Sequence, residues 1–471
     1  MPSSLLLKKR KAHIIIGANP LFGHFEKLNR IGADLVNRGY SVTILTGTCY
    51  RDEVESIGAE FAALKGRANY NPRDFRKLLL CNEPVLVGPD QAAWGFRTFL
   101  IDPIPDQHEC LQTLLATLKD KDIVYIDDTG FGALIPTYLG APNSIRPGKV
   151  IKIGTSPLPH ASTDVPAWGM GLPLDSVTGK TSSEEGLFYS DIIQKPFEAA
   201  ISATGAACAE LVPFITSLSK WSDLYLTMSI PEFEYPRSDL PDNVRFIGAL
   251  PAVGSRKEDR MLPEWWEEVV LDQRKHKKPI VVITQGSVHN NPRDLILPTI
   301  EALKDEDVIL ITTLVGLPAE MINTSKNLKV AEFIPFDILF DHTTVLVSNG
   351  GYGVVQLALS KGLPMVLAGM SADKAETNAH AAWMGGAINL ATQRPKPNQI
   401  RDAVRAVLSD PEWKTRSEGI KREYAKYDAL GMIAAAVEEL QFLTSQPKHR
   451  LSLLERLRSQ IVKLSRWFYP C

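Results

Sequence analysis

The sequence predicts an α/β protein built from two Rossmann-like domains. Residues 12–20 read AHIIIGANP, and short apolar runs rich in β-branched residues are typical of buried parallel strands. Residues 12–47 then continue with a stretch of helical spacing and a second apolar run, which predicts two parallel strands joined by a crossover helix. The same alternation restarts near residue 278 after a polar segment, so two separate series are expected and a single barrel is not.

The expected elements extend through both halves of the chain. In the first half, strands are expected at residues 121–128, 149–157, 223–229 and 243–250, and a helix at 131–140. In the second half, strands are expected at 278–287, 307–316, 327–335, 344–351 and 363–369, and helices at 295–304, 354–362, 375–387 and over most of 402–443. The expected domains are 1–245 and 263–440, joined by a linker at 246–262 and followed by a basic C-terminal helix at 441–471 that packs back on the first domain.

Composition excludes several classes of protein. The chain has 471 residues and a net charge of −2, so no global field attracts it to nucleic acid. Its five cysteines are scattered and show no CxxC spacing, which argues against a disulfide framework or a zinc site and fits a reducing compartment. The N-terminus lacks a signal-peptide core, and no apolar run is long enough to span a bilayer. We therefore expect a cytoplasmic protein.

A glycine-rich turn lies between an expected strand and an expected helix. Residues 347–353 read VSNGGYG, with Asn349, Gly350, Gly351 and Gly353 at the start of the helix. Free backbone N–H groups and the positive end of a helix make such a turn a ready anion site, and glycines let a ligand approach the backbone. Two interpretations stay open: a diphosphate site, or a tight turn without a ligand. The pattern is neither GxGxxG nor a P-loop, so an NAD-dependent enzyme or an NTPase is not indicated.

Three segments resemble the UDP-glycosyltransferase family. Residues 333–390 match the nucleotide-sugar signature of that family in order and spacing: aromatic-x-Pro, His-x-Gly-aromatic, Gly-x-Pro, then Asp-Gln with Asn-Ala. Residues 22–47 resemble its Gly-His, helix, Arg-Gly, Val-Thr opening, and residues 281–287 resemble its Ser-Phe-Gly-Ser segment. The resemblance implies the GT-B fold, with an acceptor-binding N-terminal domain, a nucleotide-sugar-binding C-terminal domain and chemistry in the cleft between them.

The sequence departs from the family pattern at four positions. The diphosphate-binding histidine of the family is Asn349 here, and a following hydroxyl is replaced by Val354. The acid that grips the ribose falls at Leu357, and the Asp-Gln pair reads Asp373-Lys374. An asparagine can still donate a hydrogen bond to a phosphate oxygen, and Lys374 can donate to sugar hydroxyls.

The resemblance places the catalytic base at His24, which follows Gly23 after the first expected strand. A neutral histidine can take a proton from an acceptor hydroxyl, although a structural histidine beside a turn is the alternative. Asp127 is favoured as the carboxylate that orients the imidazole, because its spacing from Asp122 matches the Asp-x-x-x-x-Asp strand of the family. Asp128 is its competitor, and an aspartate at a strand end can also simply cap a helix.

The resemblance also implies roles in binding the UDP-sugar and the acceptor. Phe333 can stack on the base while the Ile334 backbone reads its edge, or Phe333 can be a core aromatic. Ser287 can donate to phosphate or cap a helix. The proline-rich loop after residue 159 suggests a weak acceptor-pocket assignment for His160 and Trp168. The complete expected donor site is Ser287, Phe333, Ile334, Asn349, Gly350, Gly351, Tyr352, Gly353, Asp373 and Lys374.

Two further segments have ordinary interpretations. Residues 305–307 read DED but lie between an expected helix and strand, so we expect a solvated turn there and no bound metal; the enzymes that this chain resembles need none. Residues 451–470 form a basic amphipathic pattern that can lie on an anionic membrane or pack across the N-terminal domain.

These features predict an inverting glycosyltransferase of secondary metabolism. It would move a hexose from a UDP-sugar to a hydroxyl of a small lipophilic acceptor of natural-product, sterol or glycolipid type. The alternative is a non-catalytic sugar-nucleotide-binding or partner protein with a degenerate donor site, which Asn349 and Leu357 motivate.

Overall fold

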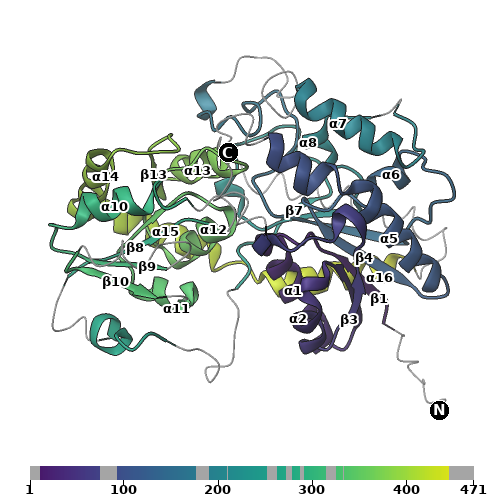
Figure 1. Cartoon of the computed structure of the whole chain (residues 1–471), viewed down its shortest axis with the longest axis horizontal. Helices are drawn as coiled ribbons and strands as arrows, with labels where there is room; N and C mark the ends of the chain where they lie inside the picture. The colour runs from purple at the N-terminus through teal and green to yellow at the C-terminus, as the bar shows by residue number, and fades with distance from the viewer. Residues whose placement is uncertain are drawn as a thin grey trace, which may run out of the picture.

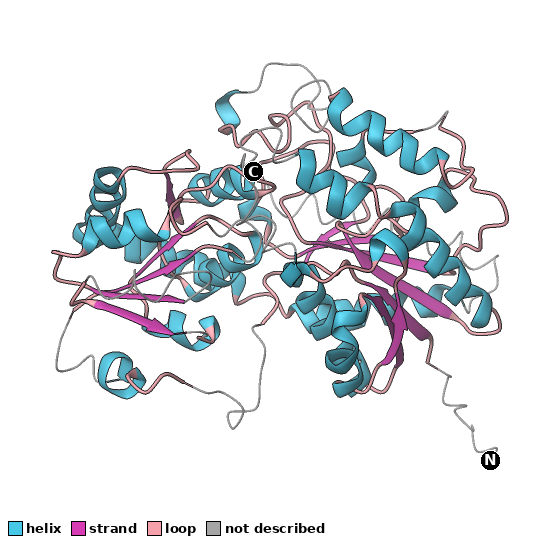
Figure 2. Ribbon diagram, viewed as in Figure 1, coloured by secondary structure: helices cyan, strands magenta, loops and turns pink. Residues whose placement is uncertain are grey.

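The structure is a computed structural model, and it describes residues 11–74, 93–176, 190–208, 211–251, 262–271, 278–286, 291–313, 325–331 and 334–444. Two parallel β-sheets, one in each half of the chain, form separate groups of strands in Figures 1 and 2. Helices cover both faces of each sheet. The predicted fold class, two Rossmann-like units of α/β type, is confirmed.

The first sheet has the strand order β3-β2-β1-β4-β5-β6-β7, and every pair in it is parallel. Its strands are β1 (His13–Gly17), β2 (Ser41–Thr46), β3 (Glu60–Ala63), β4 (Ile123–Asp128), β5 (Lys149–Gly154), β6 (Leu224–Thr227) and β7 (Val244–Phe246). The second sheet has the order β10-β9-β8-β11-β12-β13 and is also parallel throughout. Its strands are β8 (Ile280–Thr284), β9 (Ile309–Thr313), β10 (Leu328–Ala331), β11 (Val345–Ser348), β12 (Met365–Leu367) and β13 (Ala387–Asn389).

The helices of the first half are α1 (Phe22–Asn37), α2 (Arg51–Ser56), α5 (Ile104–Thr117), α6 (Ile135–Tyr138), α7 (Asp191–Ser202) and α8 (Phe214–Ser217). Those of the second half are α10 (Ile296–Leu303), α11 (Phe336–Leu339), α12 (Tyr352–Lys361), α13 (Lys374–Trp383), α14 (Pro397–Ser409), α15 (Glu412–Tyr424) and α16 (Ala429–Thr444). No described helix is long and apolar enough to cross a membrane.

The opening of the chain shows why these residues form these elements. All five residues of β1 are buried, as expected for a strand that lies between two others. Helix α1 buries Phe25, Leu28 and Leu35 along one face, and these side chains join the core above β1 and β4. Gly39 follows the helix with φ +82, where its lack of a Cβ permits the left-handed turn into β2.

The strand order of each sheet reverses at one point, and this point positions the site. In the first sheet the reversal lies between β1 and β4, and in the second it lies between β8 and β11. Loops that leave the carboxyl ends of such neighbouring strands diverge to opposite faces and leave room for ligands. His24 follows β1 and Asp128 ends β4, while Asn349 follows β11.

Helix α16 returns from the second half to the first. It packs against α1, β4 and β5, and Arg245 of β7 makes a bidentate ion pair with Glu439 at 2.7 and 3.1 Å (Figure 1). The returning helix therefore begins at Ala429, inside the range 263–440 that the sequence suggested for the second domain. The predicted tail helix at 441–471 lies outside the described residues from 445 onward and stays a prediction.

We expect Leu440→Ala to destabilise the protein by about 2–5 kcal/mol, because it leaves a cavity where α16 meets the first half. Leu440 is buried in the core that spans α1, β4 and α16. Glu438 is exposed on the same helix, so Glu438→Ala is the matched control. Urea unfolding followed by circular dichroism measures both variants. Equal stability of the two would contradict the packing of α16 on the first half.

Candidate active site

His24 and Asp128 form a hydrogen-bonded pair where α1 meets β4. His24 Nδ1 lies 2.7 Å from Asp128 Oδ2, and Asp128 is fully buried while the imidazole is 23 % exposed. Asp128 Oδ1 also accepts the Gly130 N–H at 2.8 Å, which fixes the carboxylate. Because an ionised carboxylate only accepts hydrogen bonds, Nδ1 carries the proton and Nε2 keeps a lone pair. Nε2, the ring nitrogen that does not bond Asp128, can therefore take a proton from a substrate.

The loop after β4 closes directly on the imidazole. A Cβ on Gly130 would lie 2.6 Å from His24 Nδ1, so a side chain there would displace the ring. Asn19 holds this loop in place: its buried amide donates to Phe99 O at 2.7 Å and to Gly130 O at 3.0 Å. The Asn19 carboxamide oxygen accepts the Leu21 N–H and the Tyr70 hydroxyl. The sequence analysis missed Asn19, although an asparagine between the first strand and the first helix was visible in GANP.

Asp127, which the spacing favoured as the partner of His24, does not contact it; the partner in the structure is Asp128. Its carboxylate lies 2.6 Å from Lys152 Nζ, and both side chains are buried. Successive side chains of a strand point to opposite faces. Asp128 shares the face of Ile126, which packs under α1, whereas Asp127 shares the face of Tyr125, which belongs to the core beside α5. Asp127 therefore cannot serve the face on which His24 lies.

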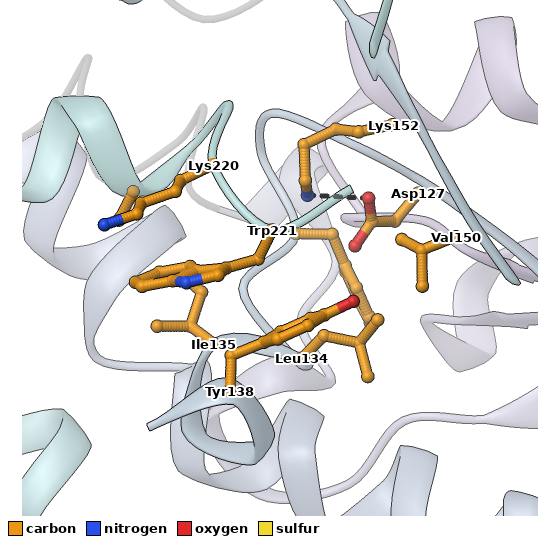
Figure 3. A pocket seen from close by; sticks show the side chains of 10 residues that line it. Asp127, Leu134, Ile135, Tyr138, Val150, Lys152, Lys220 and Trp221 are labelled. Atoms are coloured by element: carbon orange, nitrogen blue, oxygen red, sulfur yellow. Dashed lines mark hydrogen bonds and ion pairs between the residues drawn. The ribbon is translucent and has the colours of Figure 1, made fainter. Parts of the chain in front are cut away.

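Figure 3 shows the surroundings of Asp127. A small pocket is lined by the ion pair and by aromatic and apolar side chains that include Tyr138 and Trp221. Burial raises the pKa of Asp127 to about 6, although the Lys152 ammonium opposes this shift. The pair is a buried structural contact between β4 and β5, and removal of one partner would leave the other charge uncompensated.

The glycine turn after β11 is built by close backbone packing. Asn349 is 2 % exposed, and Gly350 follows it with φ +84. A Cβ on Gly350 would overlap the carboxamide of Asn378, a buried α13 residue that also donates to Gly369 O at 3.1 Å. Only glycine fits at Gly350 on both grounds. Asn378 is a second positioning residue. The sequence could have indicated it, because Asn378 and Ala379 form the Asn-Ala part of the family signature.

The start of α12 has open space in front of it. Gly351 immediately precedes the helix, and a Cβ built on it meets no atom within 4 Å. Gly286, after β8, faces Asn349, with its built Cβ 3.5 Å from the Asn349 amide nitrogen. A Cβ on Gly353 would lie 3.1 Å from Lys27 Cε and 3.2 Å from Lys27 Nζ. Helix α1, which carries His24, therefore contacts the glycine turn of the other half.

Asp373 and Lys374 lie where α13 begins. Lys374 is 8 % exposed, and its ammonium makes no hydrogen bond or ion pair with any described residue. Burial lowers the pKa of Lys374, and the Asp373 carboxylate opposes that shift. Lys374 is therefore a buried lysine at the start of α13, the helix whose Asn378 packs against Gly350 of the glycine turn.

Several predicted donor-site residues have other positions. Tyr352 is 3 % exposed and packs edge-on against Phe233 of the first half, with ring centroids 6.0 Å apart, so its side chain joins the two halves and does not face a ligand. Ile334 is 2 % exposed, which leaves only its backbone for recognition. Ser287 and Phe333 lie outside the described residues.

The two residues expected in the acceptor pocket are packing residues. Trp168 is 4 % exposed in the core of the first half, and its indole N–H donates to Pro157 O at 3.0 Å. His160 packs edge-on against Tyr225, with centroids 6.3 Å apart, and burial lowers its pKa to about 4. The family resemblance suggested a pocket in this loop, which is rich in proline, glycine, serine and threonine, but the sequence does not reveal which of its rings turn inward.

A different set of aromatic rings adjoins the His24 pair. Tyr70 and Phe99 both contact Asn19, and their ring centroids are 5.4 Å apart. Trp94 packs edge-on against Phe99 at 5.6 Å. Tyr70 and Trp94 are partly exposed, whereas Phe99 is buried.

A buried cluster of charges joins the two halves. His380 of α13 is fully buried between Glu234 of the first half and Glu376 of α13, at 3.4 Å from each. Glu376 Oε2 accepts the N–H groups of Gly169 and Gly171 at 3.0 and 3.2 Å, so the proline-rich loop of the first half is attached to the same helix. The helix that begins with Asp373 and Lys374 is thereby fixed against the half that carries His24.

This cluster favours the charged form of the histidine. Burial by itself would lower the pKa of His380, but contact with the Glu234 and Glu376 carboxylates outweighs it and raises the pKa to about 9. The Tyr235 ring lies over the imidazole, with centroids 4.1 Å apart, and favours a cation as well.

The fold and this arrangement of residues define a glycosyltransferase of the GT-B class. The family model described as "Erythromycin biosynthesis protein CIII-like, C-terminal domain" matches residues 296–440. UDP-glucosyltransferase avaP of Aspergillus versicolor is 48% identical over 93% of this chain and 99% of that protein. UDP-glycosyltransferase 2 of Phaeomoniella chlamydospora is 43% identical over 93% of this chain and 97% of that protein. The chain belongs to the UDP-glycosyltransferase family.

A solved structure agrees on the fold. The glycotransferase of kitacinnamycin matches with a TM-score of 0.64 and 19% identity, over 92% of this chain and 99% of that one.

The His380 cluster leads to a pH prediction. The pKa of His380 is raised on folding from an unfolded value of about 6.5, so its stabilisation is fully present below that value and is lost as the pH rises through about 9. We expect the difference in unfolding free energy between the unaltered protein and His380→Gln to shrink over this window. Urea unfolding at pH 6, 7.5 and 9.5 measures it. A difference that does not change with pH would refute the charged state of His380.

Proposed function

We propose that this chain is an inverting hexosyltransferase that uses His24 as its general base. The observation that carries the proposal is the contact between the buried Asp128 carboxylate and His24 Nδ1. His24 lies on α1, and Lys27 of the same helix contacts Gly353 of the glycine turn. The proposal places a base and an anion site where the two halves meet. The names of the relatives support a UDP-sugar as donor.

The reaction balances with the groups present. The acceptor O–H bond breaks and its proton passes to His24 Nε2, while the oxygen forms a bond to the anomeric carbon of the hexose. The bond from that carbon to the β-phosphate oxygen breaks on the opposite side, and its electron pair leaves with UDP. Asp128 stabilises the imidazolium that results. Backbone N–H groups at Gly351 and Gly353 lie at the positive end of α12, where they stabilise the departing diphosphate.

The acceptor in this proposal is a small lipophilic molecule, as the sequence analysis suggested. The partly exposed rings of Tyr70 and Trp94, which pack on the buried ring of Phe99, support it, because Asn19 links Tyr70 to the loop beside His24. Asp373 and Lys374 are assigned to the sugar hydroxyls, and Asn349 to the diphosphate. The reaction as written needs no metal and no cofactor beyond the donor substrate. The cytoplasmic location and a membrane contact of the tail remain predictions.

The non-catalytic alternative explains Asn349 and Leu357 but not the His24 pair. A protein that only bound a sugar nucleotide would have no need of a histidine fixed by a buried carboxylate, a Gly130 contact and the Asn19 hydrogen bonds. These contacts favour the enzyme.

We expect His24→Ala to lower transfer to a hydroxyl acceptor by about 10²–10⁴-fold, the usual contribution of a general base. Affinity for UDP should stay close to that of the unaltered protein, because His24 is assigned to the acceptor and no bond to the diphosphate is assigned to it. Initial rates of UDP release with UDP-glucose and a panel of alcohols and phenols measure the first effect, and calorimetry the second. An acidic phenol should lose less than an alcohol. Full turnover on an alcohol would show that His24 is structural.

Asp128→Asn and Asp127→Asn form a matched pair of neighbouring changes. Asp128→Asn should reduce kcat, but by less than His24→Ala, since the unoriented imidazole still accepts a proton some of the time. Asp127→Asn should leave kcat of the folded enzyme within about twofold and lower stability by about 3–5 kcal/mol, because Lys152 stays buried without its partner. Rates and urea unfolding of both variants test this. The opposite assignment of effects would restore Asp127 as the partner of His24.

We expect Gly351→Val to weaken UDP binding by at least tenfold without a large loss of stability. The added side chain would occupy the open space in front of α12 that the diphosphate needs, and it meets no protein atom within 4 Å at Cβ. Calorimetric titration with UDP is the measurement, with an unfolding curve as control. Unchanged affinity in a folded variant would remove the diphosphate from the glycine turn.

A further inference from the structure

We propose that Lys27 supplies the positive charge that the UDP diphosphate meets at the glycine turn, in place of the imidazole that Asn349 has replaced. The inference rests on the proposed function and adds a residue to it. Lys27 lies in the first half of the chain, whereas the glycine turn lies in the second. The donor site would then be completed across the boundary between the halves.

The position of Lys27 is the first argument. It lies three residues after His24 on α1, so the two side chains share one face of the helix. Its ammonium donates to the Gly23 carbonyl one turn back, which holds the side chain toward the start of the helix. Cε and Nζ lie 3.1 and 3.2 Å from the point where a Cβ of Gly353 would be. The ammonium is therefore held against the first turn of α12.

The charges around this ammonium are the second argument. Burial lowers the pKa of Lys27, and the carboxylates of Asp128 and Asp373 both oppose that shift. Neither carboxylate forms an ion pair with it: Asp128 bonds His24, and no ion pair joins Lys27 to any described residue. One of the three donor positions of the ammonium is used by Gly23 O. The others are available to phosphate oxygens.

The chemistry of Asn349 is the third argument. An asparagine side chain is neutral and can give a phosphate a hydrogen bond but no charge. The diphosphate gains negative charge as its bond to the sugar breaks, and a fixed cation lowers the energy of that state more than a neutral donor does. Lys374 is a second lysine among the described residues of the site, and it begins α13 directly beside Asp373. Of these two lysines, Lys27 is the one that contacts the turn at Gly353.

Gly353 has a specific role in this arrangement. A Cβ there would lie 3.1 Å from Cε and 3.2 Å from Nζ, which is a tight contact, so the end of Lys27 would have to shift by a few tenths of an ångström. Glycine at this position thus allows the lysine from the other half its present approach to the helix end. The contact with Lys27 therefore accounts for a glycine at position 353 without any need for a positive φ.

The test compares UDP with uridine, which lacks the charged groups. Calorimetric titrations of UDP, UMP and uridine are made with the unaltered full chain, Lys27→Gln and Lys27→Arg. Lys119→Gln, in the exposed turn after α5, is the control for the loss of one lysine. We expect Lys27→Gln to weaken UDP binding by roughly 10- to 100-fold, the range for a hydrogen bond to a charged group. Uridine affinity should not change, and Lys27→Arg should recover part of the loss.

A second variant, Gly353→Ala, keeps the Lys27 ammonium but shifts its position. Gly353→Ala should weaken UDP binding in the unaltered background by several-fold, and by less in the Lys27→Gln background, because the displaced ammonium is then already absent. This cycle does not depend on the stability of Lys27→Gln alone.

The outcomes separate the two proposals. If the unaltered chain binds no UDP, the proposed function fails and the assignment of Lys27 fails with it. If it binds UDP and Lys27→Gln binds UDP as well as Lys119→Gln does, only the assignment of Lys27 is overturned. Equal losses for UDP and uridine would also overturn it, since a cation for the diphosphate cannot act on uridine.

Discussion

The site depends on one constraint: the carboxyl edges of two parallel sheets must be held facing each other. A parallel sheet sends all its strand ends to one edge, so each half of the chain offers its reactive loops on one side only. The Glu234–His380–Glu376 cluster meets this constraint by burying a cation between two carboxylates from the two halves. Such a contact needs all three partners in place, because an unpaired buried charge is costly.

The general architecture was predictable because its signals are local. The β-branched run of β1, the apolar spacing of α1 and the stop at Gly39 depend on neighbouring residues alone. Helix α5, with the sequence IPDQHECLQTLLAT, was not predicted, because polar residues interrupt its apolar face. The helix expected at 131–140 is the shorter α6, Ile135–Tyr138. Pro136 is tolerated in the first turn of a helix, and the glycines that precede α6 do not favour an earlier start.

The candidate site was only partly predictable, and the errors have physical causes. His24, Asn349 and the glycines follow from motif and position. The choice between Asp127 and Asp128 depends on which face of β4 meets α1, and a one-residue shift moves a side chain to the opposite face. His380 contacts Glu234 and Lys27 contacts Gly353, and both partners are distant in the sequence, so no local pattern marks either residue.

The return of α16 has a consequence for how the protein is divided. The first sheet is covered partly by the last described helix, so the N-terminal structural unit consists of two pieces, residues 11–251 and 429–444, with the second sheet inserted between them. A chimaera made by one crossover in the linker would join the sheet of one parent to the closing helix of another. Exchange of acceptor and donor halves between relatives therefore calls for two crossovers, the second of them just before Ala429.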